Sequence, residues 1–265
     1  MRLALFGSPV RHSLSPAMHQ AALAHVGIDG EYVARDVDEP GFVRGISELR
    51  DGELDGANVT MPHKVLAYRC CDKRTELAER AGAVNTLSRA GAAVVGDNTD
   101  VLGIREAWRW AGLPENDPVT ILGAGGAAAA ALLALGGRRL QIMARSADKA
   151  LALLNRTGVA ADVCAWNETP TFDGVVLNAT PIGMRGERLD DRLLATATGL
   201  LDLAYGDTVT PAVVVMRESG RPVAEGLDML IGQAAASFRI WTGRTVAPDV
   251  MRAAAQRELA RRRAG

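Results

Sequence analysis

The segment GAGGAA has the spacing of a nucleotide-binding turn. It places Gly123, Gly125 and Ala128 in the pattern G-x-G-x-x-A, directly between a predicted strand and a predicted helix. Glycines permit a tight turn and a close approach of the backbone, while the helix N-terminus offers amide hydrogens and a positive dipole end to a pyrophosphate. The strand–turn–helix–strand context of residues 119–146 therefore predicts dinucleotide binding, with a merely structural tight turn as the alternative.

The end of the next predicted strand bears on the choice of cofactor. An acidic residue that would bind a ribose 2'-hydroxyl is absent there, and Arg145 and Ser146 follow Ala144 instead. Arg145 can fork onto a 2'-phosphate, and Ser146 can add a hydroxyl. This pattern favours NADP, and the alternative is a surface arginine that merely begins a loop.

Two charged residues at predicted helix starts are candidates for proton chemistry. In NVTMPHK, Pro62 suits the first position of a helix and Lys64 follows in the first turn, where a cation faces the unfavourable end of the dipole. That placement favours a functional role for Lys64. Asp100, in GDNTD, stands where a helix start favours an acid behind Asn98 or Thr99, so capping alone would explain it.

The segment GSPVRHSLSPAMHQ, residues 7–20, concentrates hydroxyl and imidazole groups just after the first apolar run. Ser15 followed by Pro16 is typical of an N-cap and the first helical residue. Ser13 and His12 have no such structural explanation. We therefore treat the segment as a candidate functional loop.

Alternating strands and helices position these residues and predict an α/β fold with mainly parallel sheets. The predicted strands lie near 3–7, 31–37, 55–60, 119–122, 140–144, 174–181 and 199–205, a hairpin near 83–98, and helices near 16–26, 40–49, 99–111, 226–241 and 248–263. The candidate residues follow strand ends, where parallel sheets bind ligands. A polar stretch at 112–118 indicates that one unit ends near residue 100.

Composition limits the class of partner. The chain has 265 residues, 48% hydrophobic and 23% charged, which is enough for two modest cores. A formal net charge of -1 provides no field that would attract nucleic acid or an anionic membrane, so small molecules are the expected partners. The one basic cluster, RELARRRAG at 257–265, is interpreted as a solvated helix end without function.

Cysteine usage and hydropathy predict a cytoplasmic protein. Cys70, Cys71 and Cys164 show no C-x-x-C spacing, so neither a disulfide framework nor a metal site is expected. The first apolar run is interrupted by Gly7, and no later stretch is long and apolar enough to span a bilayer. We expect no export signal and no membrane span.

Taken together, the motifs resemble those of the shikimate dehydrogenases, including their quinate-using relatives. The resemblance covers about residues 3–243 and rests on eight motifs in order: GSPVRHSLSPAMH, NVTMPHK, GAVNT, GDNTD, GAGGAA, NATPIGM, DLAY and EGLDMLIGQAAASFRIWTG. It implies an NADP-dependent reduction of 3-dehydroshikimate to shikimate in aromatic amino acid biosynthesis. Ala144 departs from it, since relatives commonly carry asparagine there, and so do Val101 and Gln20.

The resemblance also implies roles for individual residues. Lys64 and Asp100 match the catalytic pair, and Ser13 and Ser15 match the groups that hold the substrate carboxylate. The remaining substrate contacts would come from Thr60, Asn85, Tyr205 and Gln233. Cofactor contacts would come from Gly123, Ala124, Gly125, Gly126, Ala127, Arg145, Ser146, Thr180 and Met229.

The implied architecture has two domains. Residues 1–100 would form the substrate-binding catalytic domain, completed by the last helices at about 228–265, and residues 101–227 would form the Rossmann domain. The expected assembly is a monomer or homodimer. Quinate or an aminoshikimate remains an alternative substrate. A non-catalytic dinucleotide-sensing regulator is the alternative of a different class, and the presence of both Lys64 and Asp100 argues against it.

Overall fold

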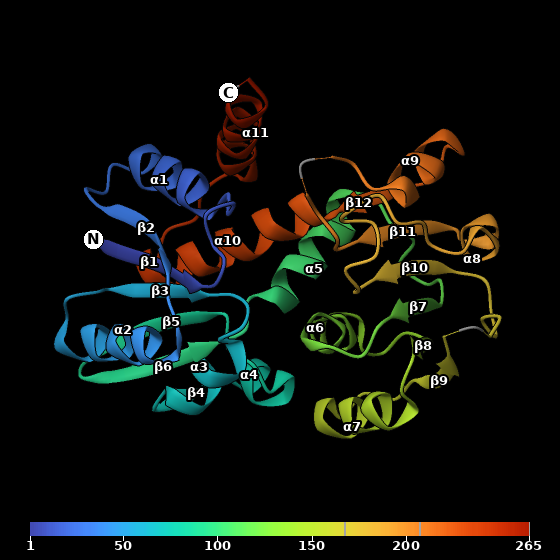
Figure 1. The fold of residues 1–265 in the computed structure, drawn as a ribbon, viewed down its shortest axis with the longest axis horizontal. Helices are drawn as coiled ribbons and strands as arrows, with labels where there is room; N and C mark the ends of the chain where they lie inside the picture. Colours follow the sequence, from blue (N-terminus) through green and yellow to red (C-terminus); the bar gives the residue numbers. More distant parts are fainter. Residues whose placement is uncertain (167, 207, 265) are drawn as a thin grey trace. The chain divides into compact units, whose positions relative to one another are not determined.

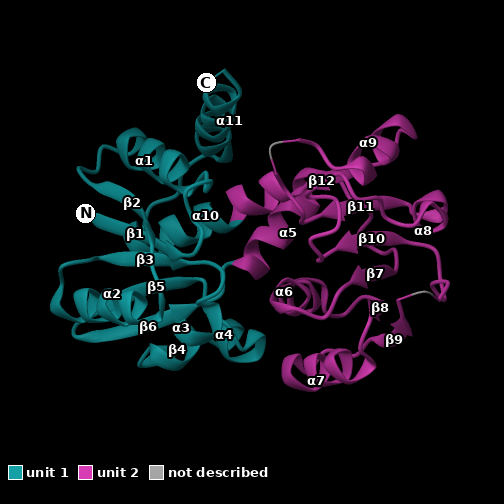
Figure 2. Cartoon of the chain, in the orientation of Figure 1, with its two compact units in different colours: residues 1–99, 233–265 teal, residues 100–232 magenta. Residues whose placement is uncertain are grey.

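The computed structural model describes residues 1–166, 168–206 and 208–264. The chain forms two compact units, one made of residues 1–99 with 233–265 and the other of residues 100–232 (Figure 2). The second boundary lies inside helix α10 (Gly226–Thr242), whose two ends belong to different units. No helix among the described residues is long and apolar enough to cross a membrane.

The first unit contains a mixed six-stranded sheet (Figure 1). In chain order its strands are β1 (Arg2–Gly7), β2 (Glu31–Asp36), β3 (Gly56–Val59), β4 (Lys73–Arg74), β5 (Thr86–Ala90) and β6 (Ala93–Asp97), and their spatial order is β2-β1-β3-β5-β6-β4. The predicted hairpin is confirmed, since β5 pairs antiparallel with β6. Strand β5 also runs antiparallel to β3, while β1, β2 and β3 are parallel.

Strand register brings the candidate residues of this unit to one edge of the sheet. Phe6 pairs with Val59, Asn58 pairs with Thr86, and Thr86 pairs with Asp97. The segments that begin after Gly7, after Val59, before Thr86 and after Asp97 therefore share an edge. Those four segments contain Ser13 and Ser15, Thr60 and Lys64, Asn85, and Thr99.

Helices cover the two faces of this sheet. They are α1 (Ser15–His25), α2 (Glu39–Asp51), α3 (Lys64–Cys70), α4 (Glu76–Ala81), the second part of α10, and α11 (Pro248–Ala264). Helix α10 approaches the sheet closely because position 56 is glycine, where a Cβ would lie 2.3 Å from Nε1 of Trp241. Nε1 of Trp241 donates instead to the Leu87 carbonyl (2.9 Å), which anchors α10 on the strands.

The second unit has the Rossmann strand order. Its strands are β7 (Val119–Leu122), β8 (Leu140–Ala144), β9 (Asp162–Ala165), β10 (Val175–Asn178), β11 (Gly199–Asp202) and β12 (Val223–Glu225), arranged β12-β11-β10-β7-β8-β9 with all pairs parallel. The order reverses between β7 and β10, which is where such sheets bind ligands. Its helices are α5 (Asp100–Trp110), α6 (Gly126–Leu135), α7 (Ala147–Thr157), α8 (Asp191–Thr196), α9 (Pro211–Glu218) and the start of α10.

The predicted α/β class is confirmed, and the longer predicted elements occur as expected. The elements that sequence patterns did not predict are mostly short: α4, α8, β4 and β12 have between two and six residues. So few residues cannot establish a hydrophobic period, because a helix needs about two turns to repeat its apolar stripe.

Candidate active site

The loop between β1 and α1 places Ser13 and Ser15 at a helix start, but not with the predicted cap. Leu14 occupies the N-cap position without a side-chain hydrogen bond, and Ser15 is the first helical residue. The prediction that Ser15 is the N-cap and Pro16 the first residue is wrong, because Leu14 already has a helical conformation (φ -88°, ψ -10°). Ser13 supplies the local contact instead, since its Oγ accepts the Ser15 amide hydrogen at 3.2 Å.

The start of α1 is suited to an anion. No acidic residue lies in the first turn of α1, and its N-cap residue, Leu14, makes no side-chain hydrogen bond. The positive end of the helix dipole therefore meets the two serine hydroxyls at the shared edge of the sheet. Ser15 is buried and Ser13 is half-buried, which favours a small anionic group over a large one.

Lys64 is the first residue of α3, so its predicted place in a first turn is confirmed. Pro62, however, is not a helical residue: it forms a cis peptide bond with Met61 and precedes the N-cap, His63. The prediction fails there because residues 60–63 form a turn, in which the His63 amide donates to the Thr60 carbonyl (2.9 Å). The Lys64 carbonyl accepts the Val84 amide hydrogen (3.0 Å), which fixes the start of α3 beside β5.

Asn85 joins two chain segments at the same edge of the sheet. It is 3% exposed, and its Oδ1 accepts the Thr99 amide hydrogen at 2.8 Å and the Thr99 hydroxyl at 3.1 Å. The backbone carbonyl of Asn85 accepts from Val59 at 2.8 Å. Asn85 thus holds together the ends of β3 and β6, and its contact with a substrate stays a prediction.

Four polar side chains next to this edge are joined by hydrogen bonds. We call them the hydroxyl cluster: Asn58, Thr86, Thr99 and Ser237. The Ser237 Oγ lies 2.8 Å from the Thr86 hydroxyl and 3.1 Å from the Thr99 hydroxyl, and it accepts from Asn58 Nδ2 at 3.0 Å. Asn58 and Ser237 are not among the residues predicted from the sequence. Asn58 and Ser237 are 179 positions apart, so no local spacing connects them.

Gln233 lies one helical turn before Ser237 on α10. Its backbone carbonyl accepts the Ser237 hydroxyl (3.0 Å). Its side-chain Oε1 is buried and has no hydrogen-bond partner among the described residues. A buried acceptor without a donor costs free energy, so this oxygen fits a donor such as a ligand hydroxyl.

Asp100 opens α5 and is 3% exposed, so the predicted acid in a first helical turn is confirmed. The residues expected to cap that helix are used elsewhere. Asn98 Nδ2 donates to the Ala83 carbonyl (3.0 Å), and Thr99 belongs to the hydroxyl cluster. Lys64 and Asp100 belong to different units, so their pairing stays a prediction.

The glycine turn lies at the switch point of the second sheet. Gly123 has φ +105°, a conformation that favours glycine, and a Cβ there would lie 3.1 Å from the Ala179 carbonyl oxygen. Beyond it, Gly125 and Gly126 have no atom within 4 Å of an added Cβ, so the backbone at the start of α6 is open. No acidic residue lies in the first turn of α6, and the third position of the fingerprint, Ala128, is fully buried.

A buried polar network shapes the loop that faces this turn. Asn178 ends β10, and its Oδ1 accepts both the Thr180 hydroxyl (2.6 Å) and the Thr180 amide (3.1 Å). Its Nδ2 donates to Asp202 Oδ1 (2.8 Å), and Asp202 Oδ2 accepts the Thr210 hydroxyl (2.6 Å). Burial raises the pKa of the Asp202 carboxyl, while the hydrogen bonds from Thr210 and Asn178 oppose that shift. Asp202, which supports the Thr180 loop through Asn178, is not among the residues predicted from the sequence.

The remaining predicted cofactor and substrate residues lie at or near the same edge. Arg145 follows β8, is exposed, and has no hydrogen bond or ion pair to any described residue. Ser146 has a structural role that the sequence analysis did not assign, because it is the N-cap of α7 and accepts from Lys149 N at 3.3 Å. Tyr205 is 38% exposed and follows β11, and Met229 lies half-buried in the first turn of α10.

Two family models match the chain. One, described as the shikimate dehydrogenase substrate binding domain, matches residues 5–87, and the other, the shikimate 5'-dehydrogenase C-terminal domain, matches residues 226–256. A curated relative from Exiguobacterium sp., named shikimate dehydrogenase (NADP(+)), is 35% identical and covers 94% of this chain and 95% of the relative. The chain belongs to the shikimate dehydrogenase family.

Solved members of the shikimate dehydrogenase family share the fold. The crystal structure of shikimate 5-dehydrogenase from Thermus thermophilus, in complex with NADP(H) and shikimate, has a TM-score of 0.86 at 34% identity and covers 97% of this chain and 99% of that one. The enzyme from Listeria monocytogenes, in complex with shikimate and NAD, has a TM-score of 0.84 at 29% identity and covers 95% of both chains. The two complexes differ in cofactor.

Beside the hydroxyl cluster, this family member fully buries a histidine. His19 lies on α1, stacks on Tyr32 with ring centroids 4.4 Å apart, and is close to the side chain of Asn58. Burial lowers the pKa of His19 to about 3, and the interaction with the Asn58 side chain opposes that shift without reversing it. The ring is therefore neutral in the folded protein at neutral and mildly acidic pH.

Because His19 is buried as a neutral ring, we expect acid to lower the free energy of unfolding. An unfolded chain protonates His19 below a pKa of about 6.5, whereas the folded chain does so only near pH 3, so the free energy of unfolding falls as pH decreases between these values. We expect His19→Phe to remove a slope of roughly 1.4 kcal/mol per pH unit, measured by urea unfolding at several pH values from about 7 to about 4. The exposed His25, changed to glutamine, is the control and should leave the slope unchanged. Equal slopes for the parent and His19→Phe would contradict the neutral buried ring.

Proposed function

We propose that this chain catalyses the NADP-dependent, reversible reduction of 3-dehydroshikimate to shikimate in aromatic amino acid biosynthesis. The observation that carries the proposal is the family membership across nearly the whole chain, including a relative solved with both NADP(H) and shikimate. The first unit would bind the substrate and the second the dinucleotide. The sheet edges described above give each unit a set of ligand-facing groups of the required chemistry.

The groups at the second sheet edge fit a phosphorylated dinucleotide. The open backbone at Gly125 and Gly126 leaves room for a pyrophosphate at the start of α6, and residues 123–127 would hold it through amide hydrogens. Arg145, without a partner among the described residues, would bind the 2'-phosphate, and Ser146 would add its hydroxyl. Thr180 and Met229 would supply further cofactor contacts. When bound, NADP supplies the hydride chemistry.

The first unit would hold the substrate by its carboxylate and ring hydroxyls. Ser13 and Ser15 at the open start of α1 would bind the carboxylate. The unpaired Gln233 Oε1 would accept from a ligand donor. Thr60, Asn85 and Tyr205 would supply the remaining contacts. Multiple oriented contacts of this kind hold the reacting carbon in one pose.

Lys64 and Asp100 would carry the proton chemistry. During reduction, negative charge develops on the carbonyl oxygen, and an ammonium beside it can donate a proton or stabilise that charge. The start of α3 places Lys64 at the edge that also contains Ser13 and Asn85. Asp100 would orient Lys64 and the reacting hydroxyl.

The direct test is a set of initial rates with purified protein. We expect oxidation of shikimate with NADP to exceed every other combination of shikimate or quinate with NADP or NAD. The described residues contain no group of three or more metal-ligating side chains, and we expect EDTA to leave the rate unchanged. Activity that is abolished by EDTA and restored by a divalent metal would contradict the proposed chemistry.

The same measurements separate the alternatives. Faster turnover of quinate, or of an aminoshikimate, would assign the chain to a different substrate within the family. Binding of NADP without turnover of any of these compounds would instead identify a dinucleotide-sensing regulator.

We further propose a cytoplasmic protein that acts on small molecules, as a monomer or homodimer, with no nucleic acid or membrane partner. The three cysteines are all free thiols, which fits a reducing compartment. Analytical ultracentrifugation would determine the oligomeric state.

A serine substitution tests the carboxylate site. We expect Ser15→Ala to raise KM for shikimate about tenfold with kcat nearly unchanged, because a contact remote from the reacting carbon binds ground and transition states alike. Ser15 makes no capping hydrogen bond, but its buried hydroxyl interacts with Tyr32, so we expect a small decrease of the unfolding midpoint and a folded protein. Ser8→Ala, which removes an exposed hydroxyl of the same loop, is the control. An unchanged KM in folded Ser15→Ala would rule out the assigned contact.

A further inference from the structure

The basic C-terminal helix contacts the predicted carboxylate loop directly. Arg262 Nη1 donates to the His12 carbonyl (2.9 Å), and Nη2 donates to the Ser13 carbonyl (3.0 Å). The Arg262 side chain is only 22% exposed. The interpretation of residues 257–265 as a solvated helix end is therefore wrong for Arg262. The helical period turns this residue toward α1, although its neighbours are exposed.

A carboxylate fixes the guanidinium in this pose. Glu258, one turn earlier on α11, accepts from Arg262 Nε (2.8 Å) and is 19% exposed. Hydrogen bonds from Arg261 and Arg262 lower the pKa of Glu258 to about 2, so the acceptor stays ionised throughout the neutral range. The three nitrogens of the Arg262 guanidinium thus donate to one carboxylate and two backbone carbonyls.

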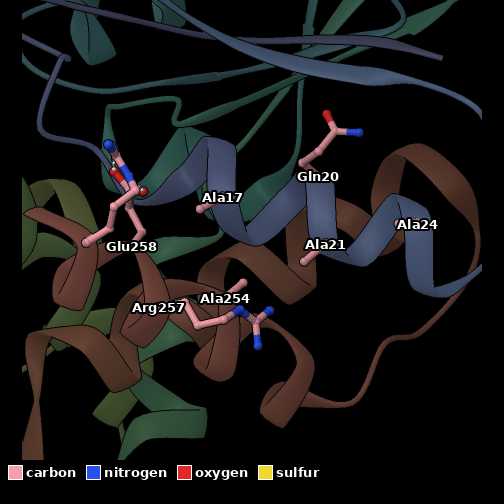
Figure 3. Close-up of a pocket in the computed structure, with 8 residues that line it drawn as sticks. Ala17, Gln20, Ala21, Ala24, Ala254, Arg257 and Glu258 are labelled. Atoms are coloured by element: carbon pink, nitrogen blue, oxygen red, sulfur yellow. Dashed lines mark hydrogen bonds and ion pairs between the residues drawn. The ribbon is translucent and has the colours of Figure 1, made fainter.

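Packing against α1 holds helix α11 in the position from which Arg262 reaches the loop. It packs along α1, and Figure 3 shows Ala254, Arg257 and Glu258 of α11 alongside Ala17 and Ala21 of α1. At the other end of α1, Arg244 Nη1 donates to the Val26 carbonyl (3.0 Å), where a cation suits the negative end of the dipole. The C-terminal segment therefore holds α1 at both ends.

The two carbonyl contacts determine what the loop presents on its other side. In a trans peptide the C=O and N–H groups point in opposite directions, so a Ser13 carbonyl turned toward Arg262 turns the Leu14 amide hydrogen away from α11. A cation on the carbonyl also polarises that peptide and strengthens its amide as a donor. The loop without Arg262 could rotate these peptides, because the described hydrogen bonds that hold residues 12 and 13 are otherwise local.

We propose that Arg262 is a positioning residue for substrate binding, which holds the Ser13–Leu14 peptide and the two serines in the geometry that accepts the substrate carboxylate. Arg262 does not touch the substrate in this proposal. It acts through the His12 and Ser13 carbonyls. The proposal rests on the proposed function, since it takes the loop as the site of a carboxylate.

The test compares steady-state constants of the full-length parent, Arg262→Met and Arg262→Lys with shikimate and NADP. We expect Arg262→Met to raise KM for shikimate on the order of tenfold, the equivalent of one hydrogen bond to a charged group, with kcat and KM for NADP nearly unchanged. Lysine at this position can donate to one carbonyl and should recover part of the loss. Discrimination between shikimate and its methyl ester should also shrink in Arg262→Met, because the loop no longer favours a full negative charge.

Arg261→Met is the matched control. Arg261 lies on the same helix and binds the same Glu258, but its side chain is 75% exposed and donates to no carbonyl of the loop among the contacts described. It should leave KM for shikimate unchanged. An Arg262→Met variant with the parent's KM, or equal effects of the two substitutions, would overturn the proposal. A parent that turns over no shikimate would instead refute the proposed function, and this inference with it.

Discussion

Replacing Lys64 by alanine is expected to lower kcat by a factor on the order of 10² to 10⁴, the range seen when a positioned proton donor is lost. Lys64 opens α3 with its backbone carbonyl bound to the Val84 amide, a contact that alanine retains. The local fold should therefore persist. Affinity for NADP, measured by fluorescence titration, should be nearly unchanged, since the dinucleotide turn belongs to the other unit.

Two further variants separate proton transfer from simple charge. Lys64→Arg keeps the positive charge but is a far weaker acid, so it should stay slow if a proton is transferred and recover if only charge is needed. Added alkylamines should partly restore Lys64→Ala. Lys73→Ala, at an exposed lysine of the same unit, is the control. A kcat of Lys64→Ala within a few-fold of the parent would make Lys64 a structural residue.

Replacing Arg145 by alanine is expected to remove at least about tenfold of the preference for NADP over NAD, because a charge-assisted hydrogen bond contributes roughly 1.5 to 3 kcal/mol. The substitution should raise KM for NADP and leave KM for NAD unchanged, because the two cofactors differ only in the 2'-phosphate. Added salt should weaken NADP binding more than NAD binding, because Arg145 is exposed and screened. Initial rates with NADP and with NAD at two ionic strengths measure the cofactor preference and its dependence on salt.

The control for Arg145 is Arg156→Ala, at an exposed arginine in the last turn of α7, the helix that begins just after Arg145. It removes the same charge from the far end of that helix and should leave the cofactor preference unchanged. A parent enzyme that uses NAD as well as NADP would show that Arg145 does not compensate for Ala144. A quinate-type catabolic role would then be the better interpretation.

The sequence by itself determined the α/β class, the two sheets and the position of the nucleotide turn. These depend on local physics. An apolar run followed by glycines and an alanine-rich helix can form only a few structures, and Gly123, with φ +105°, occupies the turn that its type permits. Lys64 and Asp100 were also found at their predicted helix starts, because both lie within a few residues of a strand–helix junction.

Predictions from local sequence were wrong or incomplete for hydroxyl residues next to helix starts. The Ser15–Pro16 pair is typical of a cap, yet α1 begins one residue earlier and Ser13 supplies the contact. Ser146 was predicted as a cofactor ligand, and it also caps α7. A hydroxyl beside a helix start can serve either purpose, and the backbone conformation decides which.

Only the tertiary structure decided which distant residues support the site. Ser237 joins Asn58 across 179 positions, and Arg262 reaches the Ser13 carbonyl across 249. Neither contact has a sequence period or motif, because hydrogen bonds between distant segments depend on how helices pack on the sheet rather than on spacing along the chain. The basic cluster at the C-terminus has the composition of a solvated end, and the packing of α11 on α1 buries one of its arginines against the carbonyls of the substrate loop.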